Sequence, residues 1–250
     1  MSVGRKGVSL LELMLSIGAF SVLALLTFYC LRQVTLMQLR NSGREEALRN
    51  LLRASEVLQR DLVNSAPGPE QFAFQAVNLG TSVHSSDAVA VLVDPQDQNG
   101  LTLDSGGGSV HTLAVTYYLA IPPNVDSLAG TPQVMGADGQ GYEDQCPFKW
   151  LVRKQEAAPL LAPPAVGTGL PPNWILNHLE QPTSLWREPQ RQVVSAEMLQ
   201  FRILHGPPQW DIELRAAARD EARKNLALGQ TPLSPTRFCL RQRITVITRN

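Results

Sequence analysis

One acidic side chain, Glu12, lies inside a long apolar run that extends from residue 8 to residue 31. No Lys, Arg or His occurs in that run, so the segment itself holds no counter-charge for the carboxylate. A carboxylate near the centre of a bilayer costs roughly 2.5–3.5 kcal/mol, and somewhat less near the end of a span. An acid at membrane depth predicts a functional group, and its positively charged partner is expected from outside the segment.

The apolar run has the length of a membrane span. As a helix it would measure about 36 Å at about 1.5 Å per residue, more than the hydrocarbon core of about 30 Å. Arg5 and Lys6 precede the run, which predicts that the first residues stay in the cytoplasm. The rest of the chain would then lie across the membrane.

Three simpler kinds of segment fit less well. A secretory signal has a shorter apolar core followed by small residues at its cleavage site, which this run does not offer. A lipoprotein signal needs small residues before its cysteine, whereas Phe28 and Tyr29 precede Cys30. A plain single-pass anchor fits the hydropathy but leaves Glu12 unexplained.

The sequence from Gly7 to Glu12, with a basic leader before it and the apolar run after it, resembles the class III leader of type IV pilins and pseudopilins. The resemblance implies that residues 1–7 are a leader peptide and that a prepilin peptidase cuts between Gly7 and Val8. Val8 would become an N-methylated first residue. The implied partner of Glu12 is the terminal amine of a neighbouring subunit, and such pairing matters most in a low-dielectric bundle.

Residues 32–66 are expected to continue the membrane helix of residues 8–31 as an amphipathic extension. No proline occurs before Pro67, and leucines recur at helical spacing. We expect the leucines to pack under a globular head and the charged side chains to form a solvated face. The leucines are Leu48, Leu51, Leu52, Leu58 and Leu62, and the charged residues are Arg44, Glu45, Glu46, Arg49, Arg53, Glu56, Arg60 and Asp61. Many major pilins carry a proline in this helix, so its absence favours a subunit other than the bulk filament protein.

Residues 67–250 are expected to form a β-rich globular head. The Pro67-Gly68-Pro69 sequence ends the helix, and short apolar stretches then alternate with turn-rich segments. The predicted strands are 88–93, 110–121, 148–153, 198–204, 210–217 and 240–248, in the pattern of an antiparallel sheet. The proline-rich stretch 157–173 is expected to be an extended loop. The predicted fold class is α+β, with a long N-terminal helix packed on an antiparallel sheet.

Cys146 and Cys239 both fall in the part of the chain that we expect outside the cytoplasm. An oxidising periplasm would permit a disulfide between them, and closing a loop of that size contributes roughly 4–5 kcal/mol in the chain-entropy model. Two cysteines without a histidine at ligand spacing do not make a four-ligand zinc site. We expect the disulfide rather than two free thiols.

No other pattern in the chain predicts catalysis, a metal or a cofactor. The acidic and Gly residues of 94–104 lack EF-hand spacing, Gly106–Gly108 lacks the Lys of a phosphate loop, and the four histidines are scattered. The formal net charge is zero, whereas a dedicated nucleic-acid binder usually has a basic excess. Two basic clusters leave DNA contact open as the less favoured alternative: Arg215, Arg219, Arg223 and Lys224, and Arg237, Arg241, Arg243 and Arg249. We expect no enzyme activity and no cofactor.

The order of the predicted elements resembles the PilW-like minor pilins and the related J-type pseudopilins of type II secretion. The shared features are Asp87 before the first apolar strand, the strands at 115–119, 151–153 and 198–204, and the ending at 241–250. The resemblance implies a minor pilin that helps initiate a type IV pilus or forms its tip complex. Its implied partners are other minor and major pilins, prepilin peptidase and the inner-membrane assembly platform.

The same resemblance implies a location for the protein. It would be a single-pass inner-membrane protein with a periplasmic head, which later enters the filament. A J-like pseudopilin of a type II secretion system is the alternative function. Motility, adhesion and DNA uptake all stay open as the output.

Overall fold

The computed structural model describes residues 9–66, 72–79, 82–93, 111–123, 148–159, 169–171, 174–175, 179, 187–188, 190–218 and 239–248. The chain divides into two compact units, Met1–Ser42 and Gly43–Asn250. Helix α1 (Leu10–Val63) begins in the first unit and ends in the second. Gly7, Val8 and Cys146, three residues of the predicted sites, lie outside the described residues.

The first unit consists, in its described part, of the apolar portion of α1. Its large apolar side chains are exposed all around the helix, among them Leu10, Ile17 and Phe20, which retain 59–76% of their accessible surface. The hydroxyls of its serines and threonines donate to backbone carbonyls one turn earlier, as Ser16 does to Glu12 at 2.7 Å. Such bonds satisfy polar groups within the helix. This helix is long and apolar enough to cross a membrane.

The second unit begins with the rest of α1, which buries one stripe of small and apolar side chains against the sheet. The stripe consists of Ala47, Leu51, Ala54, Leu58 and Leu62, each at most 1% exposed. Spacings of three and four residues keep these side chains on one face of a helix. Leu48 and Leu52, which we expected in the stripe, follow its members by one residue and turn about 100° away. They are half exposed, so the expectation for these two leucines was wrong.

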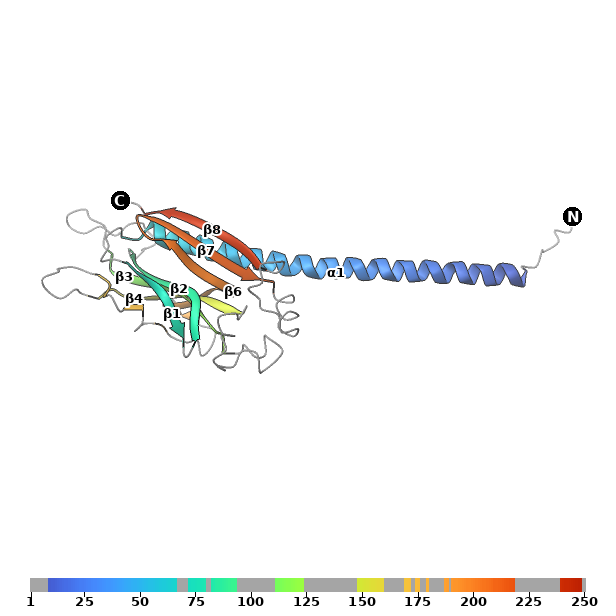
Figure 1. Cartoon of the computed structure of the whole chain (residues 1–250), viewed down its shortest axis with the longest axis horizontal. Coiled ribbons are helices and arrows are strands. Elements are labelled where there is room, and N and C mark those ends of the chain that lie inside the picture. The colour runs from blue at the N-terminus through green and yellow to red at the C-terminus, as the bar shows by residue number, and fades with distance from the viewer. Residues whose placement is uncertain are drawn as a thin grey trace. The chain divides into compact units, whose positions relative to one another are not determined.

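The described residues of the second unit form one antiparallel sheet of eight strands (Figure 1). The strands run in the spatial order β1-β2-β3-β4-β6-β7-β8, and β5 pairs with β6 beside this path. Their bounds are β1 (Phe72–Leu79), β2 (Ser82–Val93), β3 (Leu113–Ala120), β4 (Lys149–Ala157), β5 (Arg187–Glu188), β6 (Arg191–His205), β7 (Gln209–Ala217) and β8 (Cys239–Ile247). The α+β fold class with an antiparallel sheet is therefore confirmed.

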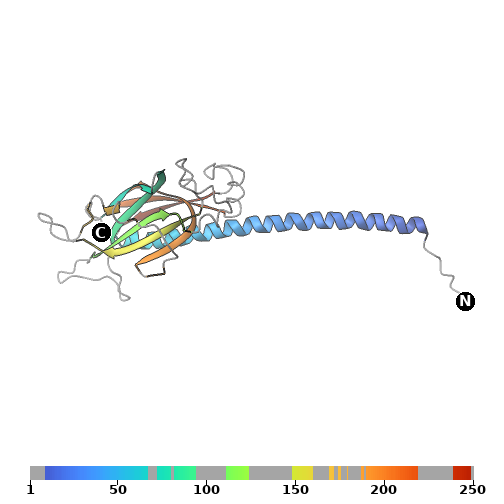
Figure 2. The ribbon, with the colours of Figure 1, turned by 90° about the horizontal axis from the view of Figure 1, so that it is seen from below.

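The sheet curls so that strands far apart in its order meet, as Figure 2 shows from below. The backbone N–H of Ile203 on β6 donates to the carboxylate of Asp87 on β2 at 2.7 Å. On the neighbouring strands, the ring of Phe72 meets the ring of Trp210 edge-on, with 5.6 Å between centroids. The curl brings β1 and β2 against β6 and β7 and encloses one apolar core together with α1.

A second apolar cluster covers the opposite face of the central strands. Ala88, Ala90 and Leu92 of β2 belong to it, with Tyr118 of β3. Leu170 also packs there, although it comes from the proline-rich stretch that we expected to be an extended loop. Because both faces of β2 are covered at residues 88–93, this part of the strand is a continuous apolar run rather than an alternating one.

Candidate functional site

The first candidate site is the start of α1, where Ser9 and Glu12 form a capping box. The backbone N–H of Ser9 donates to Oε2 of Glu12 at 3.0 Å, and the N–H of Leu11 donates to Oγ of Ser9 at 3.3 Å. A Ser followed three residues later by Glu satisfies amide groups that the first helical turn leaves without a partner. Glu12 therefore has a hydrogen-bond donor inside its own segment, the N–H of Ser9, in addition to the external partner expected from the sequence.

This internal bond does not remove the need for a counter-charge. A backbone N–H is a neutral donor, and the Glu12 side chain is exposed on the apolar helix. Among the described residues no positively charged side chain is placed beside the carboxylate, so the capping box orients the group without neutralising it. Processing at Gly7 and Val8 stays a prediction, since both residues lie outside the described part.

The predicted disulfide also stays a prediction. Cys146 lies outside the described residues, and Cys239, the first residue of β8, carries a free and partly buried thiol. The pKa of this thiol is raised, mainly by burial. The positive charge of Arg215 opposes the shift, and the negative charge of Glu213 adds to it. The net result is a thiol held in its protonated, less nucleophilic form.

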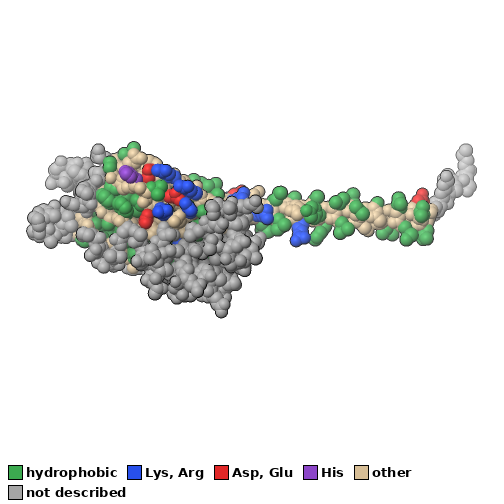
Figure 3. Space-filling model, in the orientation of Figure 1, with side chains coloured by type: hydrophobic (Ala, Val, Ile, Leu, Met, Phe, Trp, Pro, Cys, Tyr) green, Lys and Arg blue, Asp and Glu red, His purple; other side chains and the backbone are tan. Residues whose placement is uncertain are grey.

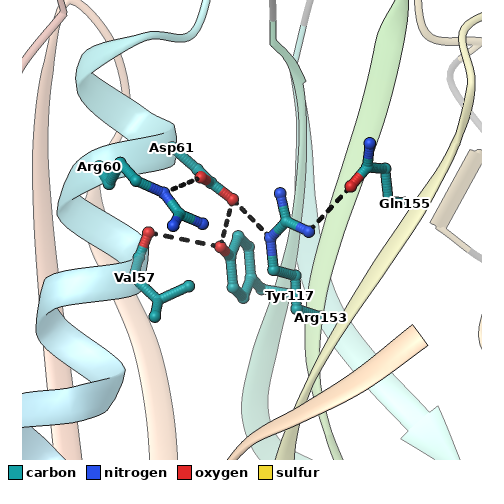
Figure 4. Close-up of polar contacts among 6 residues, drawn as sticks. All are labelled: Val57, Arg60, Asp61, Tyr117, Arg153 and Gln155. Atoms are coloured by element: carbon teal, nitrogen blue, oxygen red, sulfur yellow. Dashed lines mark hydrogen bonds and ion pairs between the residues drawn. The ribbon is translucent and has the colours of Figure 1, made fainter. Parts of the chain in front are cut away.

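The second candidate site is a buried polar cluster that joins α1 to the sheet (Figure 4). The carboxylate of Asp61 accepts a hydrogen bond from Nε of Arg153 on β4 at 2.6 Å and another from the hydroxyl of Tyr117 on β3, also at 2.6 Å. The Tyr117 hydroxyl also lies 3.5 Å from the backbone carbonyl of Val57. The side chains of Asp61 and Arg153 keep only 7% and 11% of their accessible surface, so the ion pair is nearly buried.

Burial and neighbouring charges shift the pKa values of Tyr117 and Arg153 in this cluster. Burial raises the pKa of Tyr117 well above its ordinary value, and the charge of Asp61 raises it further, so the phenol stays a neutral donor. Burial alone would lower the pKa of Arg153, but the neighbouring oxygens of Tyr117 and Asp61 outweigh it and raise the pKa. The cluster is thus the Asp61–Arg153 ion pair with an added hydrogen bond from the neutral phenol of Tyr117, and it fixes the end of α1 against two strands.

Asp61 corrects one expectation from the sequence. We assigned it to the solvated face of the helix, yet it is 5% exposed. Its position three residues after Leu58 and one before Leu62 places it at the edge of the buried stripe. The sequence signals for this buried cluster are the acid at the border of the leucine stripe, and the arginine and the tyrosine within apolar strands.

A third group of charges lies on the outer face of β7 and β8 (Figure 3). Glu213 accepts hydrogen bonds from Arg215 at 2.7 Å and forms an ion pair with Arg241, and Arg243 pairs with Asp211 at 2.9 Å. Arg215, Arg241 and Arg243 belong to the two basic clusters of the sequence, and the structure brings them together. Each of the three has a carboxylate partner, but Arg215 and Arg241 share Glu213, so the two carboxylates balance two of the three positive charges. The other five members of those clusters lie outside the described residues.

In the described part of the chain, no group of three or more His, Cys, Asp and Glu side chains is placed to hold a metal ion. The side chains that gather there instead make ion pairs, as in the Asp61–Arg153 and Glu213–Arg241 pairs.

Comparison of the chain with protein-family models, with curated proteins and with solved structures finds no match in any of the three.

Proposed function

We propose that the protein is a minor pilin, a structural subunit that helps initiate a type IV pilus or forms its tip complex. The observation that carries this proposal is the sequence from Gly7 to Glu12, which combines a small residue after two basic ones with an acid five positions later. A long apolar helix follows directly, and its exposed side chains suit either lipid or the helices of other subunits.

The capping box adds a physical argument to this proposal. It holds the Glu12 carboxylate back along the helix toward Ser9, on the side where a cut after Gly7 would leave the new terminus. A carboxylate at that end can meet the ammonium group of an incoming subunit, and each such pair removes two separate charges from lipid. The paired charges would set the axial register between neighbouring helices in the filament.

The rest of the proposal concerns location and partners. The protein would insert once into the inner membrane with its head in the periplasm, and would then join other minor and major pilins. Prepilin peptidase and the inner-membrane assembly platform would act on it before that step. The head would serve as a contact surface rather than as an enzyme.

The mature N-terminus tests the proposal directly. Protein purified from the native envelope should begin with N-methyl-valine at position 8 in an intact-mass and N-terminal peptide measurement. Gly7→Val should block the cut, because a branched side chain replaces the small residue at the cleavage site. Gly18→Val is the matched control, since a Cβ added there meets nothing within 4 Å beyond its chain neighbours and the backbone of its own helix. Wild-type protein that still begins with Met1 would rule out this function.

The same leader would serve a J-like pseudopilin of a type II secretion system, which is the alternative. A deletion strain separates the two functions. Loss of surface filaments with normal secretion of exoproteins supports the minor pilin. Loss of exoprotein secretion with intact filaments supports the pseudopilin.

A further inference from the structure

A pocket lies beside the buried cluster, at the end of α1 where the helix meets β2, β3 and β4. Its volume is about 220 Å³, and it is lined by Arg60, Asp61, Asn64, Val93, Leu113, Arg153 and Gln155. All of these residues belong to the second unit of the chain. Five of the seven side chains are polar or charged, so the pocket suits a polar ligand with a small apolar part.

The charges around the pocket do not cancel. Two guanidinium groups, those of Arg60 and Arg153, face the single carboxylate of Asp61 through their Nε atoms, at 3.0 and 2.6 Å (Figure 4). Both carboxylate oxygens of Asp61 are already in use, Oδ1 by Arg60 and Oδ2 by Arg153 and Tyr117. Because the Tyr117 phenol is neutral, one positive charge remains without a counter-charge among the side chains that line the pocket.

The side chains that line the pocket also offer hydrogen-bond donors to a ligand. Both arginines contact Asp61 through Nε, and Nη1 of Arg153 donates to Oε1 of Gln155 at 3.0 Å; among the described residues, the terminal amino groups of Arg60 show no further hydrogen bond. Since the Gln155 oxygen accepts that bond, its amide NH₂ is left as a donor. The neighbouring backbone carbonyls are occupied, because Arg60 O accepts from Asn64 N and Leu62 O from Ser65 N.

We propose that this pocket, the Arg60–Arg153 pocket, binds a carboxylate group. A carboxylate is planar and has two oxygens, which match the fork of guanidinium donors better than a spherical anion does. A single negative charge balances the single excess positive charge of the lining. Val93 and Leu113 offer an apolar wall for the carbon atoms that carry the group. The carboxylate could belong to a free small acid or to an acidic side chain of another chain.

Binding can be measured on the full-length protein in detergent micelles. The Nε–H signals of Arg60 and Arg153 in nitrogen-15 spectra report on the two groups directly. The probes are sodium acetate and a terminally blocked Gly-Glu-Gly peptide, titrated at constant ionic strength against sodium chloride. The Gly-Gln-Gly peptide and inorganic phosphate serve as comparison ligands. We expect saturable shifts of both signals with a carboxylate in the millimolar range and none with chloride or the Gln peptide.

Two variants make the assignment specific. Arg60→Gln should weaken carboxylate binding by about fivefold or more, since it removes charge-assisted hydrogen bonds at the pocket. Arg60 is half exposed, so the buried pair of Asp61 and Arg153 remains and the protein should stay folded. Arg53→Gln is the matched control, because Arg53 is exposed on the same helix and does not line the pocket.

Each result decides the proposal. Saturable binding of acetate and of the Glu peptide shows that the carboxylate group is sufficient, and binding of the peptide alone points to an acidic partner chain. No saturable shift with either probe overturns the proposal. Equal binding by wild type and Arg60→Gln also overturns it, as does phosphate binding tighter than both carboxylates.

Discussion

The carboxylate of Asp61 on α1 and the guanidinium of Arg153 on β4 form a buried ion pair at 2.6 Å, although 92 residues separate them in the chain. The pair fixes the last turns of the helix to the centre of the sheet. A buried pair of this kind is costly to break, because removal of one partner leaves the other charged and desolvated. Its consequences for stability can be measured.

Asp61→Asn should destabilise the protein by about 3–5 kcal/mol, because it leaves the Arg153 guanidinium buried without a counter-charge. Chemical unfolding of the full-length protein in micelles, followed by tryptophan fluorescence, would measure the difference. Glu56→Gln is the control, since Glu56 is exposed on the same helix, and it should change stability by less than about 0.5 kcal/mol. Equal effects of the two variants would show that the pair does not stabilise the fold.

Tyr117→Phe removes only the hydroxyl that donates to Asp61 at 2.6 Å and keeps the ring in the core. The free energy of unfolding should fall by about 1.5–3 kcal/mol, the range for hydrogen bonds to charged groups. The same change made in the Asp61→Asn background should cost measurably less, because the two side chains share one interaction. Strictly additive losses would mean that Tyr117 and Asp61 act independently.

Leu58→Ala should cost about 2–5 kcal/mol, since the side chain is fully buried between α1 and the sheet and its loss leaves a cavity. Leu52→Ala provides the comparison on the same helix, because Leu52 is 51% exposed. Its effect on the midpoint of unfolding should be small. A larger loss at Leu52 than at Leu58 would contradict the assignment of the buried face.

Substitutions at the start of α1 separate the charge of Glu12 from its capping role. Glu12→Gln keeps the S-x-x-Q form of a capping box and removes only the charge, whereas Ser9→Ala removes the cap and keeps the charge. If the proposed function is correct, Glu12→Gln and Glu12→Val should insert and be processed normally but enter filaments poorly. Ser9→Ala should assemble better than either.

The measurement compares the amount of protein in sheared filaments with the amount in the membrane fraction. Normal incorporation of Glu12→Gln would show that the negative charge is not needed for assembly. Loss of incorporation in Ser9→Ala alone would assign the function to the cap instead.

Glu213 predicts a stability that depends on pH. Burial raises the pKa of this carboxyl, but the hydrogen bond from Arg215 and the charges of Arg215 and Arg241 outweigh it, so the pKa lies below its ordinary value of 4.5. A lowered pKa in the folded state means that the unfolded chain takes up the proton first as the pH falls. The stabilisation is complete above about pH 4.5 and is lost as the pH falls further, through the folded-state pKa.

Glu213→Gln should therefore be less stable than wild type near neutral pH, and the difference should shrink as the solution is acidified below about pH 4.5. Unfolding by denaturant at a series of pH values gives this difference directly. A gap between the two proteins that stays constant with pH would exclude Glu213 as the titrating group.

The sequence predicted the classes of the elements better than their contacts. The continuous helix follows from the absence of proline before Pro67, and the apolar run at 88–93 predicted the end of β2. Strand β1 and the first half of β6 were missed, because the segments 72–79 and 191–197 mix polar and apolar residues without clear alternation.

The contacts of the buried cluster could not be read from the chain. Asp61 meets Tyr117 and Arg153 because its turn of α1 lies over β3 and β4. The register of β3 against β4 places Tyr117 directly opposite Arg153. Composition and periodicity contain no information on such long-range registers. The capping box, in contrast, can be recognised in the sequence from Ser9 and Glu12 at a spacing of three residues.

Strand β4 pairs with β6 as far as Met198, and among the described residues no strand continues this pairing along the remainder of β6, up to His205. Exposed backbone N–H groups on such an edge can recruit a strand from another molecule and start aggregation. Asp87 occupies the N–H of Ile203 with a side-chain oxygen, which cannot continue a ladder as a backbone carbonyl would. The curl of the sheet therefore places a side-chain acceptor against this edge of β6, at an N–H group that an added strand would otherwise use.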